Sequence, residues 1–421
     1  MSILNKTHTE IDKHIQDNLT IRDKEKDKFG EVFTSPELID EILDNIPPHV
    51  WKNPDNKWLD PAAGNGNFMS KVYSKLLTTL SSKIPDLGKR KKHILDNMLF
   101  MIELNRNNTE KLIILFGTKA NISNTDFLNQ QDKWKHDLKT EVFDVIVGNP
   151  PFQTPKSDKY SGSVGNRTLW DKFLDTIFHK RVIKESGYMG IITPSNWRRP
   201  LHPLYKTLTV DNQLIYLHVF NKKMGLEKLG AQTRFDLYIV QEGTTKKSVK
   251  TEIIDETNKS HKIDVHKWPF LPNYNFDKIK KIMVPKKKGI KVIFDAGKYD
   301  ARHLSKTKTK KNRHPIVHNI TMRGLGLRYA KKKDKKHFNV PKVLLNFNER
   351  QYPYNDFDGK YGMTQLTFGI PIKSKTHGEK VIKAVNSDEF KEILEATKWS
   401  SFQTDYRMFA YFDPDFYKTI Y

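Results

Sequence analysis

The stretch FDVIVGNPPFQ, residues 143–153, ends an apolar run with residues that can hold an amino group. Asn149 offers a side-chain carbonyl and Pro150 offers a backbone carbonyl, which together provide acceptors for two N–H bonds. Pro151 restricts Pro150 to extended geometry, and Phe152 offers a ring face on which a planar group can stack. A purely structural turn is the alternative, because glycine and proline also end strands where no ligand binds.

A glycine-rich turn earlier in the chain has the form expected of a ligand site. In KWLDPAAGNGNF, residues 57–68, Asp60 follows an apolar strand, and Gly64 and Gly66 lack the Cβ that would keep a ligand from the backbone. The pattern is neither G-x-G-x-x-G nor a P-loop, since no Gly-Lys-Ser/Thr follows, so a phosphate cradle is not favoured. An acid at a strand end suits a cationic group or a hydroxyl instead.

Two further acids follow in order and suit a nucleoside. Glu103, in LFMIELN, can accept hydrogen bonds from two ribose hydroxyls, as the acid of dinucleotide folds does. Asp126, in NISNTDFLN, can accept a hydrogen bond from an adenine amino group, with Phe127 beside the ring. Each acid taken alone also suits a helix cap or a surface position. In series before Asn149, they indicate a pocket for an adenosine-bearing cofactor.

Such a pocket requires a fold that brings the ends of several strands together. From Phe29 to Glu242 the sequence alternates β and α patterns, which predicts an α/β fold with a doubly wound sheet and helices on both faces. The expected strands are 57–59, 98–102, 142–147, 187–192, 214–220 and 235–241. The expected helices are 36–45, 68–80, 107–115 and 169–180.

The regions that flank this alternation differ from it. Residues 1–28 are polar and charged, and they predict an N-terminal arm or helix. Lysine runs, scattered prolines and short aromatic segments predict a second domain, 243–421, of mixed or β-rich structure. Near its end, four aromatic residues recur at helical spacing, and we expect them to pack in the core. They are Trp399, Phe402, Tyr406 and Phe409.

Positive charge is concentrated in one segment of that second domain. The whole chain carries +24, and residues 278–336 hold 21 lysines and arginines against three acids, a net +18. This predicts a polyanion as partner, and the alternative is a solvated lysine-rich loop. Lysines suit phosphate contacts, whereas arginines can also read base edges. The candidate contacts are Lys306, Lys308, Lys310, Lys311, Arg313, Arg323 and Arg328.

Composition excludes several classes of protein. The chain has no cysteine, which excludes disulfides, thiolate metal sites and cysteine nucleophiles and fits a reducing interior. It has no apolar run of 18 residues, so we expect no membrane span, and its start lacks the apolar region of a signal peptide. His314 and His318 are four residues apart, but without a third ligand we expect no metal site.

Five motifs occur in an order that resembles a known family. GEVFTSPELIDEIL, DPAAGNGNF, IELN, TDF and GNPPF follow one another as in the gamma-class amino-group DNA methyltransferases, of the type II restriction-modification branch. LWDKFLDTI and SGYMGIITPSNW resemble a later helix and strand of the same branch. The resemblance covers residues 29–242 and implies a Rossmann-like methyltransferase domain there, followed by a mixed α+β target recognition domain at 243–421.

The resemblance also implies a cofactor, S-adenosylmethionine, and the residues that hold it. Phe33 and Thr34 would contact its methionine portion, although Ser35 separates Thr34 from Pro36 where many members have Thr-Pro directly. The implied cofactor residues are Phe33, Thr34, Asp60, Ala62, Gly64, Gly66, Glu103, Asp126 and Phe127. The implied catalytic residues are Asn149, Pro150, Pro151 and Phe152.

By this resemblance the substrate would be the N6 amino group of adenine in double-stranded DNA, reached by base flipping. Residues 153–167 would then close over the extruded base. RNA, a protein glutamine amide and cytosine N4 remain alternative substrates, and a catalytically inactive DNA-binding protein is an alternative of another class. The resemblance also implies a cognate restriction endonuclease as partner. We expect the protein itself to be cytoplasmic and associated with the nucleoid, with a prokaryotic or viral host. The sequence leaves the oligomeric state and the recognition site open.

Overall fold

The computed structural model describes residues 34–153, 168–243, 249–295, 297–348, 351–399 and 404–420, with Ile3, Thr9, Glu10 and Lys13. Phe33, most of the expected N-terminal arm, residues 154–167 and Phe402 lie outside this part of the chain. The chain divides into two compact units. The first comprises residues 1–197 and 203–267, and the second comprises residues 198–202 and 268–421.

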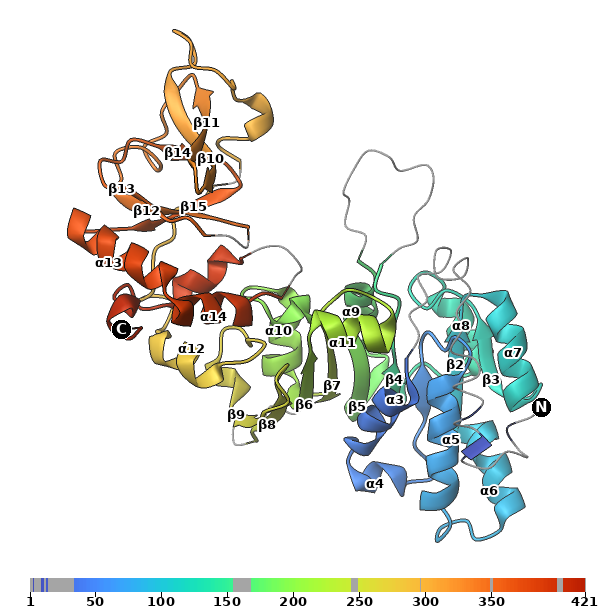
Figure 1. Cartoon of the computed structure of the whole chain (residues 1–421). Coiled ribbons are helices and arrows are strands. Elements are labelled where there is room, and N and C mark those ends of the chain that lie inside the picture. Colours follow the sequence, from blue (N-terminus) through green and yellow to red (C-terminus); the bar gives the residue numbers. More distant parts are fainter. Residues whose placement is uncertain are drawn as a thin grey trace. The chain divides into compact units, whose positions relative to one another are not determined.

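A single sheet organises the first unit (Figure 1). Its described residues form nine strands in the order β3-β2-β1-β4-β5-β7-β6-β8-β9. The five strands from β3 to β5 are parallel, and β7 runs antiparallel to both β5 and β6. The strands are β1 (Trp58–Asp60), β2 (Leu99–Glu103), β3 (Asn121–Asn124), β4 (Phe143–Gly148), β5 (Ile183–Pro194), β6 (Gln213–Phe220), β7 (Phe235–Gln241), β8 (Thr251–Ile254) and β9 (Ser260–Ile263).

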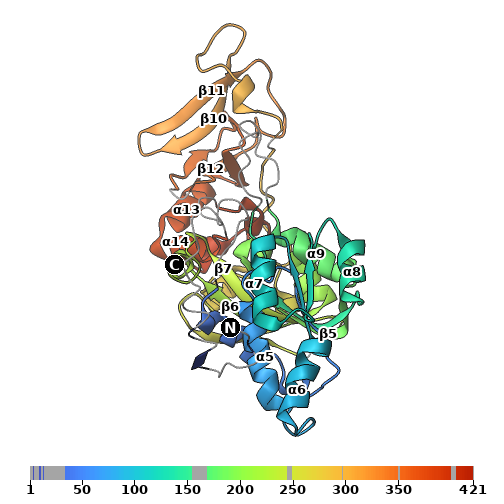
Figure 2. The ribbon, with the colours of Figure 1, turned by 90° about the vertical axis from the view of Figure 1, so that its right-hand side faces the viewer.

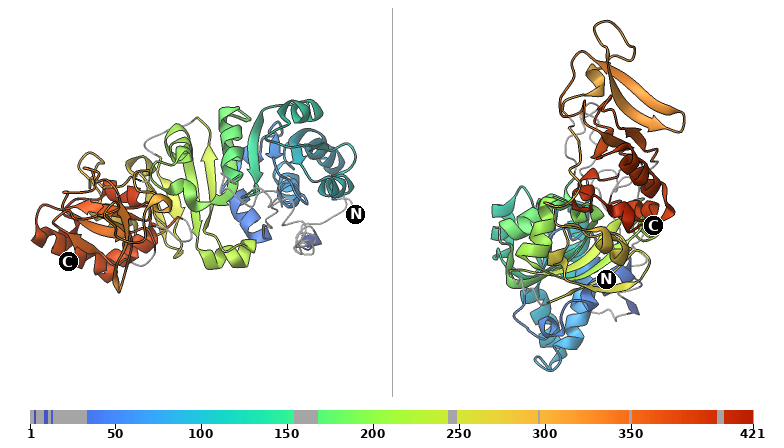
Figure 3. Two further views of the ribbon diagram at one scale, coloured as in Figure 1. Left: turned by 90° about the horizontal axis from the view of Figure 1, so that it is seen from above. Right: turned by 90° about the vertical axis from the view of Figure 1, so that its left-hand side faces the viewer.

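Helices cover both faces of this sheet (Figure 3, left). They are α3 (Pro36–Asp44), α4 (Pro48–Trp51), α5 (Asn67–Thr79), α6 (Leu87–His93), α7 (Arg106–Phe116), α8 (Gln131–Leu138), α9 (Trp170–His179), α10 (Pro203–Lys206) and α11 (Lys222–Leu229). Short π-helical turns, η2 (Ile94–Met98) and η4 (Thr207–Asp211), follow α6 and α10. No helix in the described ranges is both long and apolar enough to cross a bilayer.

Local sequence explains where these helices begin. Pro36 occupies the first turn of α3, where its missing N–H costs nothing. The Asn105 side chain caps α7 by accepting a hydrogen bond from the Asn107 N–H, and Gly117 ends the helix. Gly66 precedes α5 with a φ of +82°, a conformation that a residue with a Cβ adopts only under strain. These boundaries place the loops that follow β1 and β2 at one edge of the sheet.

The expected α/β fold with a doubly wound sheet is confirmed, and the six expected strands and four expected helices all form within a few residues of their predicted bounds. The sequence reasoning missed β3, because Asn121–Asn124 is short and mostly polar. It also placed the domain boundary too early. Strands β8 and β9 extend the first sheet, so the second unit begins at Trp268 and not at residue 243. The partly exposed, polar edge strand β9 has the composition of a loop.

The second unit is mixed α+β, as expected (Figure 2). Two three-stranded sheets, β11-β10-β14 and β13-β12-β15, meet in a cluster formed by Val317, Ile320, Leu344 and Met363. The strands are β10 (His314–Thr321), β11 (Gly324–Ala330), β12 (Lys342–Asn346), β13 (Tyr354–Asp356), β14 (Gly362–Met363) and β15 (Thr367–Pro371). The helices are α12 (Phe276–Ile282), α13 (Lys375–Asn386) and α14 (Asp388–Ala396), with 3-10 turns η6 (Ala301–His303), η7 (Tyr406–Tyr411) and η8 (Phe416–Lys418).

The C-terminal aromatic stripe packs in the core but is not one helix. Trp399 and Phe409 are 4% and 1% exposed, as the expected core role requires. However, α14 ends at Ala396, and Tyr406 and Phe409 lie in the 3-10 turn η7. Tyr406 packs against Phe368 and other aromatic rings of the second unit. Spacing alone did not distinguish a continuous helix from separate turns that face the same core.

A buried ion pair joins β12 to β13. Lys342 Nζ lies 2.6 Å from Asp356 Oδ2, and the two side chains are 0% and 2% exposed. Lys342 also donates to the carbonyls of His337 (2.8 Å) and Val340 (3.2 Å). Burial lowers the pKa of Lys342, and Asp356 opposes this effect. The carboxylate further accepts the backbone N–H groups of Lys360 and Tyr361, so the pair also holds the turn after β13.

Replacing Lys342 by methionine should lower the free energy of unfolding by about 3–5 kcal/mol, because the Asp356 carboxylate would stay buried without its cation. Urea unfolding followed by circular dichroism measures this loss. Lys391→Met is the matched control: its ion pair with Asp388 is exposed, so its loss should stay below about 1 kcal/mol. An equal loss of unfolding free energy in the two variants would show that the buried ion pair stabilises the protein no more than an exposed one.

Candidate active site

The predicted site residues converge where the strand order of the sheet reverses. β1 lies between β2 and β4. Strands β2 and β3 follow on one side of β1, and strands β4 and β5 follow on its other side. Ligands of open α/β sheets bind outside the carboxyl ends of the strands at such a point. Asp60 ends β1, Glu103 ends β2 and Gly148 ends β4, so three neighbouring strands deliver their last residues to one edge.

The two glycines of the turn after β1 have different roles. Gly64 has a φ of +54°, and a Cβ built on it would meet no atom within 4 Å. Gly66 has a φ of +82°, and a Cβ there would lie 2.7 Å from Leu112 and 2.8 Å from Phe116 of α7. Gly64 therefore borders open space in which a ligand can approach the backbone. Gly66 instead allows α5 and α7 to pack closely.

Glu103 organises the loops on either side of it. Its Oε2 accepts a hydrogen bond from the Gly64 N–H at 2.7 Å, and its Oε1 accepts one from the Asn105 N–H at 2.6 Å. The side chain is 8% exposed. A carboxylate accepts hydrogen bonds at both of its oxygens, which is the chemistry that ligand hydroxyls require. The residue expected to hold a ribose thus also fixes the glycine turn.

Asp60 is an acid whose side chain is almost completely buried. It is 2% exposed, and its Oδ1 accepts a hydrogen bond from the Ala62 N–H at 3.1 Å. Burial raises the pKa of Asp60 to about 8, and the nearby Glu103 adds to the rise, while the Ala62 N–H opposes it. A Cβ on Gly148 would lie 2.9 Å from Asp60 Oδ1, so this glycine makes room for the carboxyl group.

The Asn-Pro-Pro loop and the first motif meet through one hydrogen bond. Asn149 Nδ2 donates to Thr34 Oγ1 at 3.0 Å, across 115 positions of sequence. Thr34 is 5% exposed and immediately precedes Ser35, which serves as the N-cap residue of α3. The extra Ser35 therefore does not prevent Thr34 from reaching the site. This bond fixes the plane of the Asn149 amide.

The rest of the loop is well packed. Pro150 is buried and Phe152 is 8% exposed. The Phe152 carbonyl accepts a hydrogen bond from the Leu169 N–H at 3.1 Å, and Gln153 pairs with Thr168. Residues 154–167, which we expected to close over a base, lie outside the described residues. The pairing brings Gln153 and Thr168 together beside the Asn-Pro-Pro loop.

Asp126 and Phe127 fit their expected roles less well. Asp126 Oδ1 accepts the N–H groups of Leu128 and Asn129, and Oδ2 accepts Asn129 Nδ2, so the carboxylate caps a turn. Phe127 is 2% exposed, and its ring stacks with Trp134 at 5.8 Å and Phe173 at 5.2 Å. The expectation that Phe127 lies beside an adenine ring gives way to a core role, because neighbouring aromatic rings already cover it.

The sequence reasoning missed two residues that position the site. Asn124, at the end of β3, donates to the carbonyls of Glu103 and Leu104 and to Thr109. It thereby ties the loop after β2 to α7. The second missed residue is Gly148, which makes room for the Asp60 carboxyl group. Its position at a strand end, immediately before Asn149, could have indicated this role. Within the ranges that the structure describes, no three histidines and acids come together in a way that could hold a metal ion.

The seven predicted DNA contacts of the second unit fall into two groups. Lys306, Lys308, Lys310, Lys311 and Arg313 are exposed in the segment that leads into β10. Arg323 lies in the exposed turn between β10 and β11, and Arg328 is half-buried on β11. β10 and β11 form one antiparallel hairpin. Arg323, at its turn, lies about 25 Å from the end where the basic segment enters, at 3.3 Å per residue, whereas Arg328 pairs with Ile316 near that end.

The glycines of this hairpin also differ. A Cβ on Gly326 would lie 1.8 Å from Asn319 Oδ1, so this glycine accommodates the side chain of its cross-strand partner. Gly324, with a φ of +114°, borders open space. Gly324 therefore leaves its backbone open to the approach of another molecule, and Gly326 does not.

The first unit is thus an α/β domain in which the ends of β1, β2 and β4 bring two acids and a glycine turn beside an Asn-Pro-Pro loop. Residues 69–225 match the family model described as Eco57I restriction-modification methylase. An uncharacterised adenine-specific methylase of Mycoplasma pneumoniae is 28% identical, over an alignment that covers 40% of this chain and 55% of the relative. The chain spans about half the length of that relative.

Two solved structures are similar to this chain, and the first has the higher TM-score. The cryo-EM structure of a DrdV–DNA complex is similar with a TM-score of 0.52 and 12% identity, covering 99% of this chain and 59% of that chain. The type IIL restriction-modification enzyme MmeI, in complex with DNA, has a TM-score of 0.44 and 14% identity, covering 91% of this chain and 67% of that chain. At these identities the likeness concerns the fold alone. The resemblance to restriction-modification methylases expected from the motifs is confirmed by the family match.

The raised pKa of Asp60 predicts how stability depends on pH. The folded protein holds a proton on Asp60 up to about pH 8, whereas the unfolded chain releases it near its ordinary pKa of 3.8. This contribution to stability is therefore complete below about pH 4 and is lost as the pH rises through about 8. Urea unfolding of the cofactor-free protein from pH 5 to 8 should show this loss, at no more than about 1.4 kcal/mol per pH unit.

Asp60→Asn should flatten this pH dependence, because an amide has no proton to release and keeps an acceptor for the Ala62 N–H. If the wild-type protein and Asp60→Asn changed in parallel over this range, the carboxyl group would have an ordinary pKa in the folded state.

Proposed function

We propose that this protein transfers a methyl group from S-adenosylmethionine to the N6 amino group of adenine in DNA, after base flipping. The observation that carries the proposal is the hydrogen bond from Asn149 to Thr34 beside Asp60 and Glu103. It joins the expected cofactor residues to the expected catalytic loop at one edge of the sheet. The match to a restriction-modification methylase model supports it, as does the relative whose name states adenine specificity.

The residues at this edge fit the cofactor. Gly64 borders open space on the side where a Cβ would project, and the Glu103 carboxylate would accept hydrogen bonds from two ribose hydroxyls. A cationic group beside Asp60 would lower the raised pKa of its carboxyl group and favour the carboxylate that attracts the cation. Phe33, Thr34, Ala62 and Asp126 complete the proposed lining. When bound, S-adenosylmethionine supplies a methyl group attached to a positively charged sulfur.

The catalytic residues act by orienting the target nitrogen. The lone pair of an adenine amino group is delocalised into the ring, so the nitrogen is a weak nucleophile. Hydrogen bonds from its two N–H groups to Asn149 Oδ1 and to the Pro150 carbonyl would draw it toward tetrahedral geometry and localise that lone pair. Because Thr34 holds Nδ2 of the same amide, Oδ1 is placed before the base arrives. Phe152 would stack on the extruded base.

The second unit would read the DNA target. Its basic segment would contact phosphates, and the arginines of the β10–β11 hairpin would reach base edges. The structure with the same fold over 99% of this chain was solved as a complex with DNA. A cognate restriction endonuclease is the functional partner that a restriction-modification methylase implies. We place the activity at the nucleoid of a prokaryotic host or at viral DNA within one.

Labelled S-adenosylmethionine and adenine-containing duplex DNA test the reaction directly. Wild-type protein should transfer label to the adenine N6, with no transfer to duplexes in which the target adenine is replaced. Transfer to RNA, to cytosine N4 or to a glutamine peptide instead would reject the proposed substrate. Binding of DNA without transfer to any acceptor would favour the inactive DNA-binding alternative.

Asn149→Ala should lower the turnover rate by at least about 100-fold, the scale seen when one aligned hydrogen-bonding group is lost from an active site. Calorimetry should show that it still binds the cofactor. Asn97→Ala, a change of the same type at an exposed position, should keep the wild-type rate. A near-normal turnover rate for Asn149→Ala would show that the Asn149 side-chain amide does not contribute to catalysis.

Gly64→Ala and Gly66→Ala should separate cofactor binding from folding. Both introduce strain of about 1–2 kcal/mol at a positive φ. Gly66→Ala also forces a methyl group against Leu112 and Phe116 and should lose about 1–3 kcal/mol more. Gly64→Ala projects its methyl group into open space and should weaken cofactor binding most. Thermal unfolding and calorimetry measure the two effects, and wild-type cofactor affinity in Gly64→Ala would place the cofactor elsewhere.

A further inference from the structure

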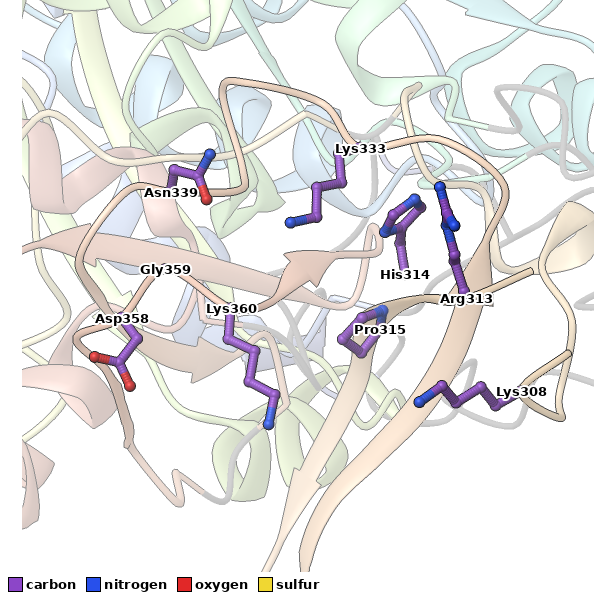
Figure 4. A pocket seen from close by; sticks show the side chains of 9 residues that line it. All are labelled: Lys308, Arg313, His314, Pro315, Lys333, Asn339, Asp358, Gly359 and Lys360. Atoms are coloured by element: carbon purple, nitrogen blue, oxygen red, sulfur yellow. The ribbon is translucent and has the colours of Figure 1, made fainter. Parts of the chain in front are cut away.

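The second unit contains a cavity of about 600 Å³ that the proposed function does not yet use (Figure 4). It is lined from four separate segments of the chain, by Lys308 and Arg313 before β10, Lys333 after β11, Asn339 before β12, and Asp358 and Lys360 after β13. The volume lies in the range of small-ligand sites, about 300–1,000 Å³. It can therefore hold a group larger than a single small ion.

The cavity carries a strong excess of positive charge. Lys308, Arg313, Lys333 and Lys360 face one carboxylate, that of Asp358. Within the described ranges, none of these four cations forms an ion pair within 4 Å. His314 also lines the cavity, and burial together with the charges of Arg313 and Lys333 lowers its pKa, so its imidazole is neutral at pH 7. Four cations that outnumber the single carboxylate beside them repel one another, and an anion that binds among them relieves this repulsion.

The walls of the cavity are held by the buried ion pair of the second unit. Asp356 accepts the Lys360 N–H at 2.7 Å, and its backbone carbonyl accepts the Gly359 N–H at 3.1 Å. The Gly359 carbonyl in turn accepts the Asn339 N–H at 2.8 Å. Lys342, bound to Asp356, anchors both segments to β12. The segments that carry Asn339 and Lys360 to the cavity are therefore held by a buried ion pair whose two charges are not exposed at the surface.

Aromatic rings position two of the lysines. Lys333 Nζ lies 5.4 Å from the centroid of the Phe338 ring, and Lys360 Nζ lies 5.5 Å from that of Tyr361. Such contacts restrict a flexible side chain and lower the entropy cost of ordering it on a ligand. The N–H groups of Gly359 and Lys360 are already used within the turn, so the donors available to a ligand are side chains. Four cationic donors around one space match the several acceptor oxygens of a phosphate group.

We propose that this cavity binds a phosphodiester group of the DNA backbone, with Lys333 and Lys360 as contacts in addition to Lys308 and Arg313. That the ligand is DNA rests on the proposed function. That the ligand carries a phosphate group rests on the cavity alone. The volume accommodates a phosphate with its sugar, and the cavity adjoins the basic segment that leads into β10. Binding there would fix the orientation of the β10–β11 hairpin on DNA without reading its sequence.

Salt-dependent DNA binding by a double variant, Lys333→Gln with Lys360→Gln, tests the proposal. At 0.1 M salt its affinity should fall roughly tenfold for each phosphate that a lysine no longer neutralises, and the slope of log K against log salt should flatten by about 1 for each such phosphate. Lys331→Gln with Lys335→Gln removes the same charge from exposed lysines that do not line the cavity, and its losses should be clearly smaller. Lys333→Arg with Lys360→Arg should restore binding.

Several outcomes separate this inference from the proposed function. If wild-type protein binds and methylates DNA but the two glutamine variants lose affinity equally, the cavity is not a phosphate site and the function stands. If wild-type protein binds no DNA, the proposed function fails. Calorimetry with pyrophosphate tests whether the cavity binds a free phosphate compound instead of DNA. If Lys333→Gln with Lys360→Gln abolished pyrophosphate binding but left the DNA affinity unchanged, the assignment of the ligand to DNA would be wrong. Urea unfolding must show wild-type stability in each variant before its affinity is compared.

Discussion

The reversal of strand order at β1 is the constraint on which the first unit depends. A parallel sheet delivers all its carboxyl ends to one edge, and only at a reversal do the following loops diverge and leave space for a ligand. Asp60, Glu103 and Gly148 come from three strands that are neighbours in the sheet but separated by up to 88 positions in sequence. Every proposed contact to the cofactor or the target base starts from this edge.

Around that edge, the backbone is fixed mainly by polar side chains that also belong to the site. Glu103 holds the glycine turn, Asn124 holds the loop after β2, and Thr34 holds the amide of Asn149. Each of these hydrogen bonds joins two groups of the protein itself and needs no ligand to form. Catalysis by positioning requires such preorganisation, because a group that must first find its orientation contributes less to the rate.

The two units use buried charge in opposite ways. In the first unit, burial raises the pKa of Asp60, and a cationic ligand beside it would lower that pKa and favour the carboxylate. In the second unit, Lys342 and Asp356 neutralise each other, and their hydrogen bonds hold the segments that carry Asn339 and Lys360. The first arrangement suits a binding site, and the second suits a scaffold beneath an exposed basic surface.

Sequence patterns predicted much of this and failed for definable reasons. Alternating periodicity identified six strands and four helices, because burial of one face determines the pattern of apolar residues. Phe127 was misjudged, since an aromatic residue beside an acid has the same pattern whether it packs in the core or against a ligand. The short strands β3, β8 and β9 were missed. β3 and β9 are polar strands at the edges of the sheet, and β8, an inner strand between β6 and β9, has only four residues.

The sequence by itself determined the order of the motifs, the α/β class of the first domain and the position of the basic segment, since each depends on local composition and periodicity. Only the tertiary structure decided which chemically identical residues share a site. Gly64 and Gly66 differ in what lies where a Cβ would project, and Lys360 joins Lys308 in one cavity although 52 positions separate them. Such proximity arises from long-range packing, which no local pattern encodes.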